Sequence, residues 1–151
     1  MAAEEYKIAY KNHCTPQEYI TENSRWYLDS DVGAKLTGGV NAAGITVTTA
    51  PVYSASTTVA ANAASPVTIG ATTQDFVFIK NLGLTSAGVA STADVYISLD
   101  ATGGKYRIKI SPGESFAAEI GTASAGSEVN SVFMKTGSGE AEQTVQTLRA
   151  T

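Results

Sequence analysis

The residues that could carry acid–base, nucleophilic or metal chemistry are few in this chain. His13 is the single histidine and Cys14 the single cysteine. A Ser/His/Asp triad would have to use His13, for which the sequence marks no partner. A zinc site normally needs three or four ligands, and only these two residues offer nitrogen or sulfur. We therefore expect no catalytic residue, no bound metal and no cofactor.

Two short motifs resemble ligand loops but fail at required positions. Asp29-Ser30-Asp31 begins like a calcium loop, yet Val40 stands where the glutamate at the twelfth position belongs. Gly104-Lys105 resembles part of a phosphate loop, yet Tyr106 stands where that loop needs Ser or Thr. Neither motif predicts a ligand site.

Paired carboxylates could serve as an acid and a base, and two pairs flank predicted strands. Glu114 and Glu119 have an odd spacing, so they lie on opposite faces of a strand. Asp94 and Asp100 share a face but lie about 20 Å apart at ~3.3 Å per residue. We interpret all four as charges on outer strand faces, and we expect that the protein is not an enzyme.

Composition excludes further classes of function. The net charge of −4 and the low proportion of Lys and Arg argue against a nucleic-acid partner, which requires clustered cations. No apolar stretch approaches the ~18 residues of a membrane span, so no membrane partner is expected. The N-terminus lacks the pattern of a secretory signal. With one cysteine, stability must come from packing or from oligomerisation.

Residues 1–36 are predicted to form an N-terminal arm before a domain over 37–151. Thr15-Pro16-Gln17-Glu18 matches a helix N-cap, which predicts a short helix from about 16 to 23. The arm is rich in large aromatics, which concentrate at interfaces. It either completes the core of its own domain or contacts a partner. The candidate partner-contact residues are Tyr6, Tyr10, Trp26 and Tyr27.

The segment from Leu36 to Gln74 contains no charged residue. Within it, Ile45–Thr48, Val52–Val59 and Val67–Ile69 have the composition of strands. One interpretation is ordinary strands with threonine-rich outer faces. The other is a sheet surface covered by a neighbouring subunit, because interface cores are depleted of charge.

Strand patterns become strong from Asp75 onward. The segment 75–80 is apolar on both faces and predicts a central strand. Alternating apolar residues predict strands over 95–100, 106–110 and 116–120, and weaker patterns predict strands over 129–135 and 141–149. In the last of these, Val145 and Leu148 can share a face only if the strand contains a bulge.

Turn residues separate these strands. Residues 101–104 predict a hairpin loop, and Ser111-Pro112-Gly113-Glu114 predicts a type II turn between antiparallel strands. A third turn is predicted over 137–139. Many short strands without long helical connections predict an all-β fold, namely an antiparallel β-sandwich or jelly-roll-like domain.

Residues 75–149 resemble the small β-sandwich virion proteins of tailed bacteriophages. The stretches that carry the resemblance are Lys80-Asn81-Leu82-Gly83, Asp94 to Asp100, Tyr106 to Ile110 and Ser111-Pro112-Gly113-Glu114-Ser115-Phe116. The resemblance implies a capsid decoration (cement) protein located in the virion, a homotrimer that binds the major capsid protein. A tail or fibre component is also consistent with it.

The main alternative is a carbohydrate-binding or adhesin-like β-sandwich, with Tyr53, Tyr96 or Tyr106 as platforms for sugar rings. A small hydrolase is a more distant alternative. Binding to glycans would favour the first of these alternatives, and co-sedimentation with phage heads would favour the decoration protein.

Overall fold

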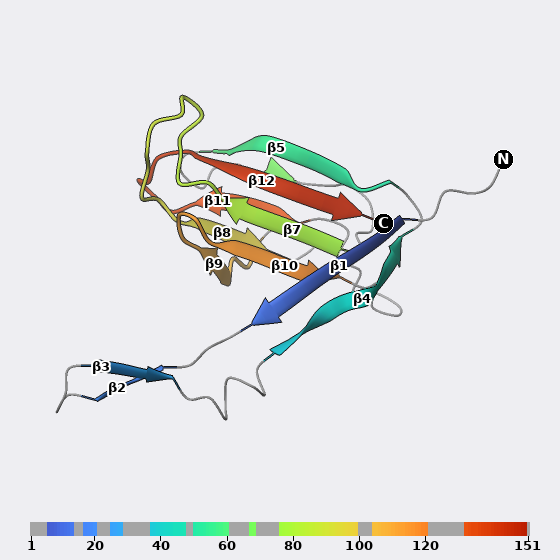
Figure 1. Cartoon of the computed structure of the whole chain (residues 1–151). Coiled ribbons are helices and arrows are strands. Elements are labelled where there is room, and N and C mark those ends of the chain that lie inside the picture. The colour runs from blue at the N-terminus through green and yellow to red at the C-terminus, as the bar shows by residue number, and fades with distance from the viewer. Residues whose placement is uncertain are drawn as a thin grey trace. The chain divides into compact units, whose positions relative to one another are not determined.

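The computed structural model describes residues 6–13, 17–20, 25–28, 37–47, 50–60, 67–68, 76–99, 104–120 and 132–150. The chain divides into two compact units, residues 1–46 and 47–151. The regular elements within the described ranges are all strands (Figure 1). No helix in these ranges is long and apolar enough to cross a membrane.

The first unit contains two pairs of strands. β1 (Tyr6–His13) pairs with β4 (Thr37–Val47), and β2 (Gln17–Ile20) pairs antiparallel with β3 (Arg25–Leu28). The unit continues past residue 36, where the sequence predicted the arm to end.

The helix predicted over about 16 to 23 is wrong for the described part of that range. Residues 17–20 form a strand, in which Tyr19 lies opposite Trp26. The prediction rested on a local cap motif, and a helix of two turns is marginal by itself. Both segments carry aromatic residues, and these favour cross-strand pairing over the short helix.

The second unit contains two four-stranded antiparallel sheets. The first sheet has the order β10-β7-β12-β5, and the second has the order β6-β11-β8-β9 (Figure 1). The strands of the first sheet are β5 (Val52–Val59), β7 (Phe76–Asn81), β10 (Ser115–Glu119) and β12 (Gln143–Ala150). Those of the second are β6 (Val67–Thr68), β8 (Val95–Ser98), β9 (Ile108–Ile110) and β11 (Phe133–Thr136).

Both sheets contribute to one hydrophobic core. Its members are Val59, Val77, Ile79 and Val145 from the first sheet, Val95, Ile97, Ile110 and Met134 from the second, and Ile120 and Val132 beside the strands. The predicted alternation is confirmed for 95–97 and 108–110, since Val95, Ile97 and Ile110 are buried while Lys109 is exposed. Ser98, predicted to point outward, is buried, and Asp100 lies outside the described residues. β7 lies inside its sheet with apolar residues on both faces, as predicted.

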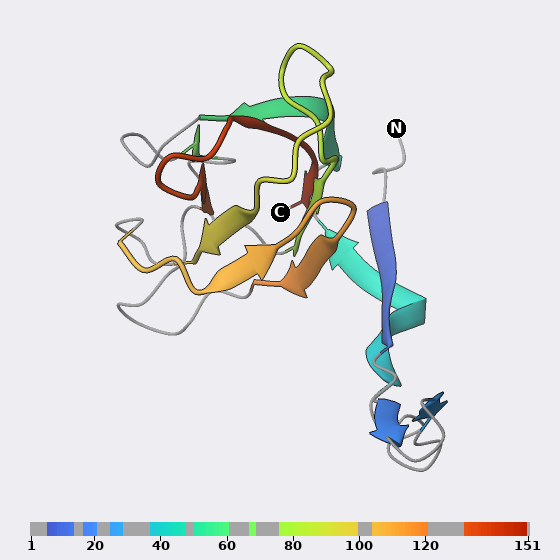
Figure 2. The same ribbon diagram turned by 90° about the vertical axis from the view of Figure 1, so that its left-hand side faces the viewer.

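Three connections between the two sheets, from β7 to β8, from β9 to β10 and from β11 to β12, lie at one end of the unit, which we call the crossing end. The register places Val95 opposite both Ile110 and Thr136, so β8 begins where β9 and β11 end. In the first sheet, β7 ends where β10 and β12 begin, because Lys80 lies opposite Ser115 and Gln146. From β7 the chain reaches β8 through a projecting loop, drawn in yellow-green in Figure 2.

The predicted turn over Ser111–Glu114 is present. Gly113 has φ +85°, and the Glu114 N–H donates to the Ser111 carbonyl at 2.9 Å. The strands it joins do not pair with each other, however, because β9 belongs to the second sheet and β10 to the first. Alternation shows that both strands are half-buried, but it does not show which strand each one pairs with.

A second turn repeats this design. Gly137–Glu140 joins β11 to β12, with Gly139 at φ +79°. In each turn the glutamate carboxylate accepts the N–H of the residue three positions earlier at 2.8 Å, Ser111 for Glu114 and Gly137 for Glu140. Each turn is therefore closed by its own side chain.

Asn81 fixes the crossing end from inside. Its buried amide donates to the carbonyls of Ala93 and Ile110 at 3.1 and 3.3 Å and accepts the Gly83 N–H at 2.9 Å. Its backbone also bonds with the 111–114 turn, since the Gly113 N–H donates to the Asn81 carbonyl at 2.8 Å. One side chain at the end of β7 thus links both sheets.

The bulge predicted in the last strand, near Val145 to Leu148, is wrong, because β12 pairs with β7 without any shift from Val145 to Ala150 and the extra residue lies in β5. The pairing of β12 with β5 shifts register between Val145 and Thr147. Two residues of β5, Ala55 and Ser56, then stand opposite Gln146 alone, which is the pattern of a β-bulge. Val145 is buried, and Leu148 points away from the core.

Candidate functional site: the outer face of the second sheet

The face of the second sheet that points away from the core carries a tyrosine between two lysines. Tyr96 on β8 lies directly opposite Lys135 on β11 and Lys109 on β9. These positions alternate with the core residues Val95, Ile97 and Met134, so the three side chains share the outer face. Side chains directly opposite in antiparallel strands have Cβ atoms about 5 Å apart. The aromatic ring is therefore flanked by a cation on each side.

A second tyrosine fixes the position of one of these cations. The Lys135 ammonium lies 4.2 Å from the centroid of the Tyr106 ring, within the range of a cation–π interaction. Burial raises the pKa of the Tyr106 hydroxyl. That hydroxyl has no hydrogen-bond partner among the residues that the structure describes. Lys135 thus covers one face of Tyr106, which leaves Tyr96 as the better stacking platform.

These residues border a shallow hollow of about 270 Å³, lined by Tyr96, Tyr106, Lys135 and Gly137. That volume is just below the range of about 300–1,000 Å³ that is usual for ligand clefts. The Glu140 carboxylate lies against Gly137, where a Cβ atom would approach it to 2.6 Å. Glycine at 137 therefore lets the carboxylate close the turn beside the hollow.

A second carboxylate lies on the same sheet. Asp94 forms an ion pair with Lys109 at 3.1 Å. Hydrogen bonds from Ser111 and Lys109 hold the pKa of Asp94 below its ordinary value, and the bond to Asp94 raises the pKa of Lys109. Both groups are charged at neutral pH. The outer face thus presents cations, carboxylates and an aromatic ring close together.

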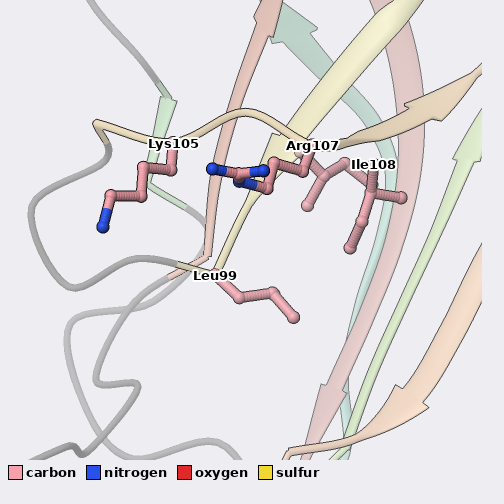
Figure 3. Close-up of a pocket in the computed structure, with 5 residues that line it drawn as sticks. Leu99, Lys105, Arg107 and Ile108 are labelled. Atoms are coloured by element: carbon pink, nitrogen blue, oxygen red, sulfur yellow. The ribbon is translucent and has the colours of Figure 1, made fainter.

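A second hollow of about 300 Å³ lies at the other side of residues 105–108. Its lining is apolar from Ile97, Leu99 and Ile108, and cationic from Lys105 and Arg107 (Figure 3). Both cations are exposed. Within the described ranges, neither forms an ion pair with a carboxylate. Because Ile97 and Ile108 face the core, this hollow is separate from the first one, which lies on the outer face.

Comparison with known proteins gives no assignment. No family model, curated protein or solved structure matches this chain. Among the described residues, no group of three or more His, Cys, Asp or Glu side chains could hold a metal ion.

The structure brings together two of the three predicted sugar platforms. Tyr96 and Tyr106 line one hollow, whereas Tyr53 lies on β5 in the other sheet with 58% of its surface exposed. Sequence reasoning missed Lys135 and Lys109, because an outward lysine in a strand has the pattern of an ordinary solvated charge. Only the strand register places both of them beside Tyr96.

The other candidate residues lie on other strands or outside the residues that the structure describes. Tyr6 and Tyr10 lie on β1 and are half-buried, and Trp26 and Tyr27 lie on β3. Their role as partner contacts stays a prediction. His13 ends β1, while Cys14, Asp29, Asp31 and Asp100 fall outside the described residues. Of the predicted hairpin loop over 101–104, Gly104 alone is described, and the strands on either side of it pair as expected.

Proposed function

We propose that this protein is a structural subunit of a virion, a decoration protein that binds the head shell as a homotrimer and stabilises it. The strand order supports a jelly roll, a two-sheet fold typical of viral capsid proteins and of lectins. The connections link β5 to β6, β7 to β8, β9 to β10 and β11 to β12, so each strand of one sheet is followed or preceded by a strand of the other. This pattern fits two sheets stacked as the layers of a sandwich.

The observation that carries an assembly role is an apolar row on the outer face of the first sheet. Ala117, Phe78, Leu148 and Tyr53 lie opposite one another across all four strands. They alternate with core residues such as Val77 and Ile79, so they point away from the core. Contiguous apolar surface of this kind marks interaction sites.

The edge of the same sheet extends this surface. β5 carries no charged residue, and Val52 and Tyr53 are 52% and 58% exposed. Edge strands of monomeric proteins are usually protected by charges, prolines or bulges, and β5 has only its central bulge. We assign the row and β5 to contacts with a second copy of the chain. Residues 1–36 are assigned to the contact with capsid protein.

The proposed mechanism is mechanical. A trimer that contacts several shell subunits adds contacts that must break before the shell opens, and linked attachments strengthen one another by multivalency. No bond is made or broken chemically.

The test is incorporation into particles. Heads assembled from the accompanying major capsid protein are mixed with the full chain, sedimented and analysed for bound protein. We expect saturable binding of the full chain. We expect a variant lacking residues 1–30 to keep the thermal midpoint of the second unit and to lose incorporation. Absence of the full chain from heads, or its location on tails by electron microscopy, would contradict a decoration role.

A further inference from the structure

The outer face of the second sheet differs from an ordinary charged surface in one respect: its ionic groups of both signs surround an aromatic ring. Tyr96 lies between Lys135 and Lys109, Asp94 lies beside Lys109, and Glu140 lies beside Gly137 at the edge of the hollow. We propose that this face binds an acidic polysaccharide, with Tyr96 stacking on a sugar ring and Lys135 binding the carboxylate of that sugar.

The roles follow from the contacts of each residue. Tyrosine offers a large apolar face with a polar tip, which suits the apolar face of a sugar ring. Lys135 is held over Tyr106 and forms no ion pair within the described part of the chain. Its ammonium can therefore donate a charge-assisted hydrogen bond to a ligand carboxylate without breaking an existing ion pair.

Lys109 is a second cation on this face, and its side chain is 54% exposed. Lys105 and Arg107 line a hollow together with Ile97 and Ile108, which face the core, so these two cations do not belong to the face. The two lysines on either side of Tyr96 lie in a chain whose net charge is −4. Their charge is complementary to the carboxylates of an acidic sugar chain.

The protein's own carboxylates on this face favour a polysaccharide over other polyanions. Sugar hydroxyls both donate and accept hydrogen bonds, so Asp94 and Glu140 can accept from them while the lysines donate. A nucleic-acid backbone offers phosphates that only accept hydrogen bonds, so Asp94 and Glu140 would find no donor on it. An acidic polypeptide also has carboxylates, but it provides no ring to stack on Tyr96. The arrangement therefore favours an acidic polysaccharide.

This inference does not rest on the proposed role in the virion. Binding to a polysaccharide is measured on the purified full chain, whereas incorporation is measured on heads. Either result can fail without the other.

The experiment uses oligogalacturonate as the probe, at low and at physiological salt, with binding measured by calorimetry. The methyl-esterified oligomer has the same backbone without the charge, and polyglutamate and single-stranded DNA have charge without the sugar. We expect binding to oligogalacturonate, with much weaker binding to the other three. Equal binding to polyglutamate or DNA, or no binding to oligogalacturonate, would overturn the proposal.

Variants separate stacking from charge. Tyr96→Ala should weaken binding by about tenfold or more, while Tyr96→Phe should retain most of it. Lys135→Gln should weaken binding about two- to fivefold at low salt and reduce its salt dependence. Val89→Ala, on the exposed loop between β7 and β8, is the control and should bind normally. The assignment of Tyr96 is wrong if Tyr96→Ala melts like the wild type and still binds equally well.

Discussion

The two sheets of the second unit share one core but present contrasting outer faces. The first sheet carries the uncharged row of Ala117, Phe78, Leu148 and Tyr53. On the second, charges of both signs surround Tyr96. Permanent burial of an apolar face is favourable, since it contributes about 25 cal/mol of free energy per Å². Permanent burial of a charged face contributes little free energy, because the cost of desolvating the charges offsets their attraction.

Under the two proposals, one small fold would separate assembly from recognition. The apolar face suits a stable contact between subunits, and the charged face suits a reversible contact with a soluble, charged ligand. Because each face is formed by its own sheet, substitutions on one should leave the other intact. The crossing end, where both sheets are joined, is the exception.

Loss of the Asn81 hydrogen bonds at the crossing end should lower the stability of the unit more than any other change considered, and it should affect both faces together. Asn81→Ala removes three hydrogen bonds and leaves the Ala93 and Ile110 carbonyls without their donor. We expect the free energy of unfolding to fall by about 2–4 kcal/mol. Urea unfolding measures this loss. Gln146→Ala, on the outer face of the first sheet, is the control and should change stability by no more than ~0.5 kcal/mol. Equal stability of the two variants would show that Asn81 does not hold the sheets together.

The turn at Gly113 should have a smaller effect on the same junction. Gly113→Val forces a β-branched residue to φ +85° and should destabilise the unit by about 1 kcal/mol or more. No heavy atom lies within 4 Å of the added Cβ position, so the cost comes from the backbone alone. Gly113→Asn should cost less, since asparagine tolerates positive φ better. Thermal melting of the two variants compares them, and identical midpoints would remove the backbone explanation.

The smallest effect is expected from the ion pair on the second sheet. The folded pKa of Asp94 is lowered, so its contribution is present at a pH above the unfolded value of about 3.9 and is lost as the pH falls through the folded value. Asp94→Asn should therefore be slightly less stable than the wild type at pH 6, and the difference should vanish at strongly acidic pH. Melting curves at both pH values measure it. A difference that persists in acid would mean that charge is not the cause.

Sequence alone predicted much of the strand content and little of the site. Patterns such as Val95 and Ile97, or Pro112-Gly113, encode local burial and local turns, and these appear in the structure. The pairing of Tyr96 with Lys135 depends on register between segments far apart in the chain, which periodicity does not encode. The failed helix near Gln17 has the same origin, because a cap motif reports local preference and not the strand that lies alongside.

The most direct test of the assembly claim is the mass of the protein in solution, measured by light scattering at micromolar concentration. We expect a trimer for the wild type and for Lys135→Glu, whose substitution lies on the second sheet. We expect a folded monomer for Tyr53→Glu, because a charge on the apolar row should prevent a second copy from covering it. A wild type that is monomeric, or a Tyr53→Glu variant with the mass of the trimer, would show that the apolar row does not mediate assembly.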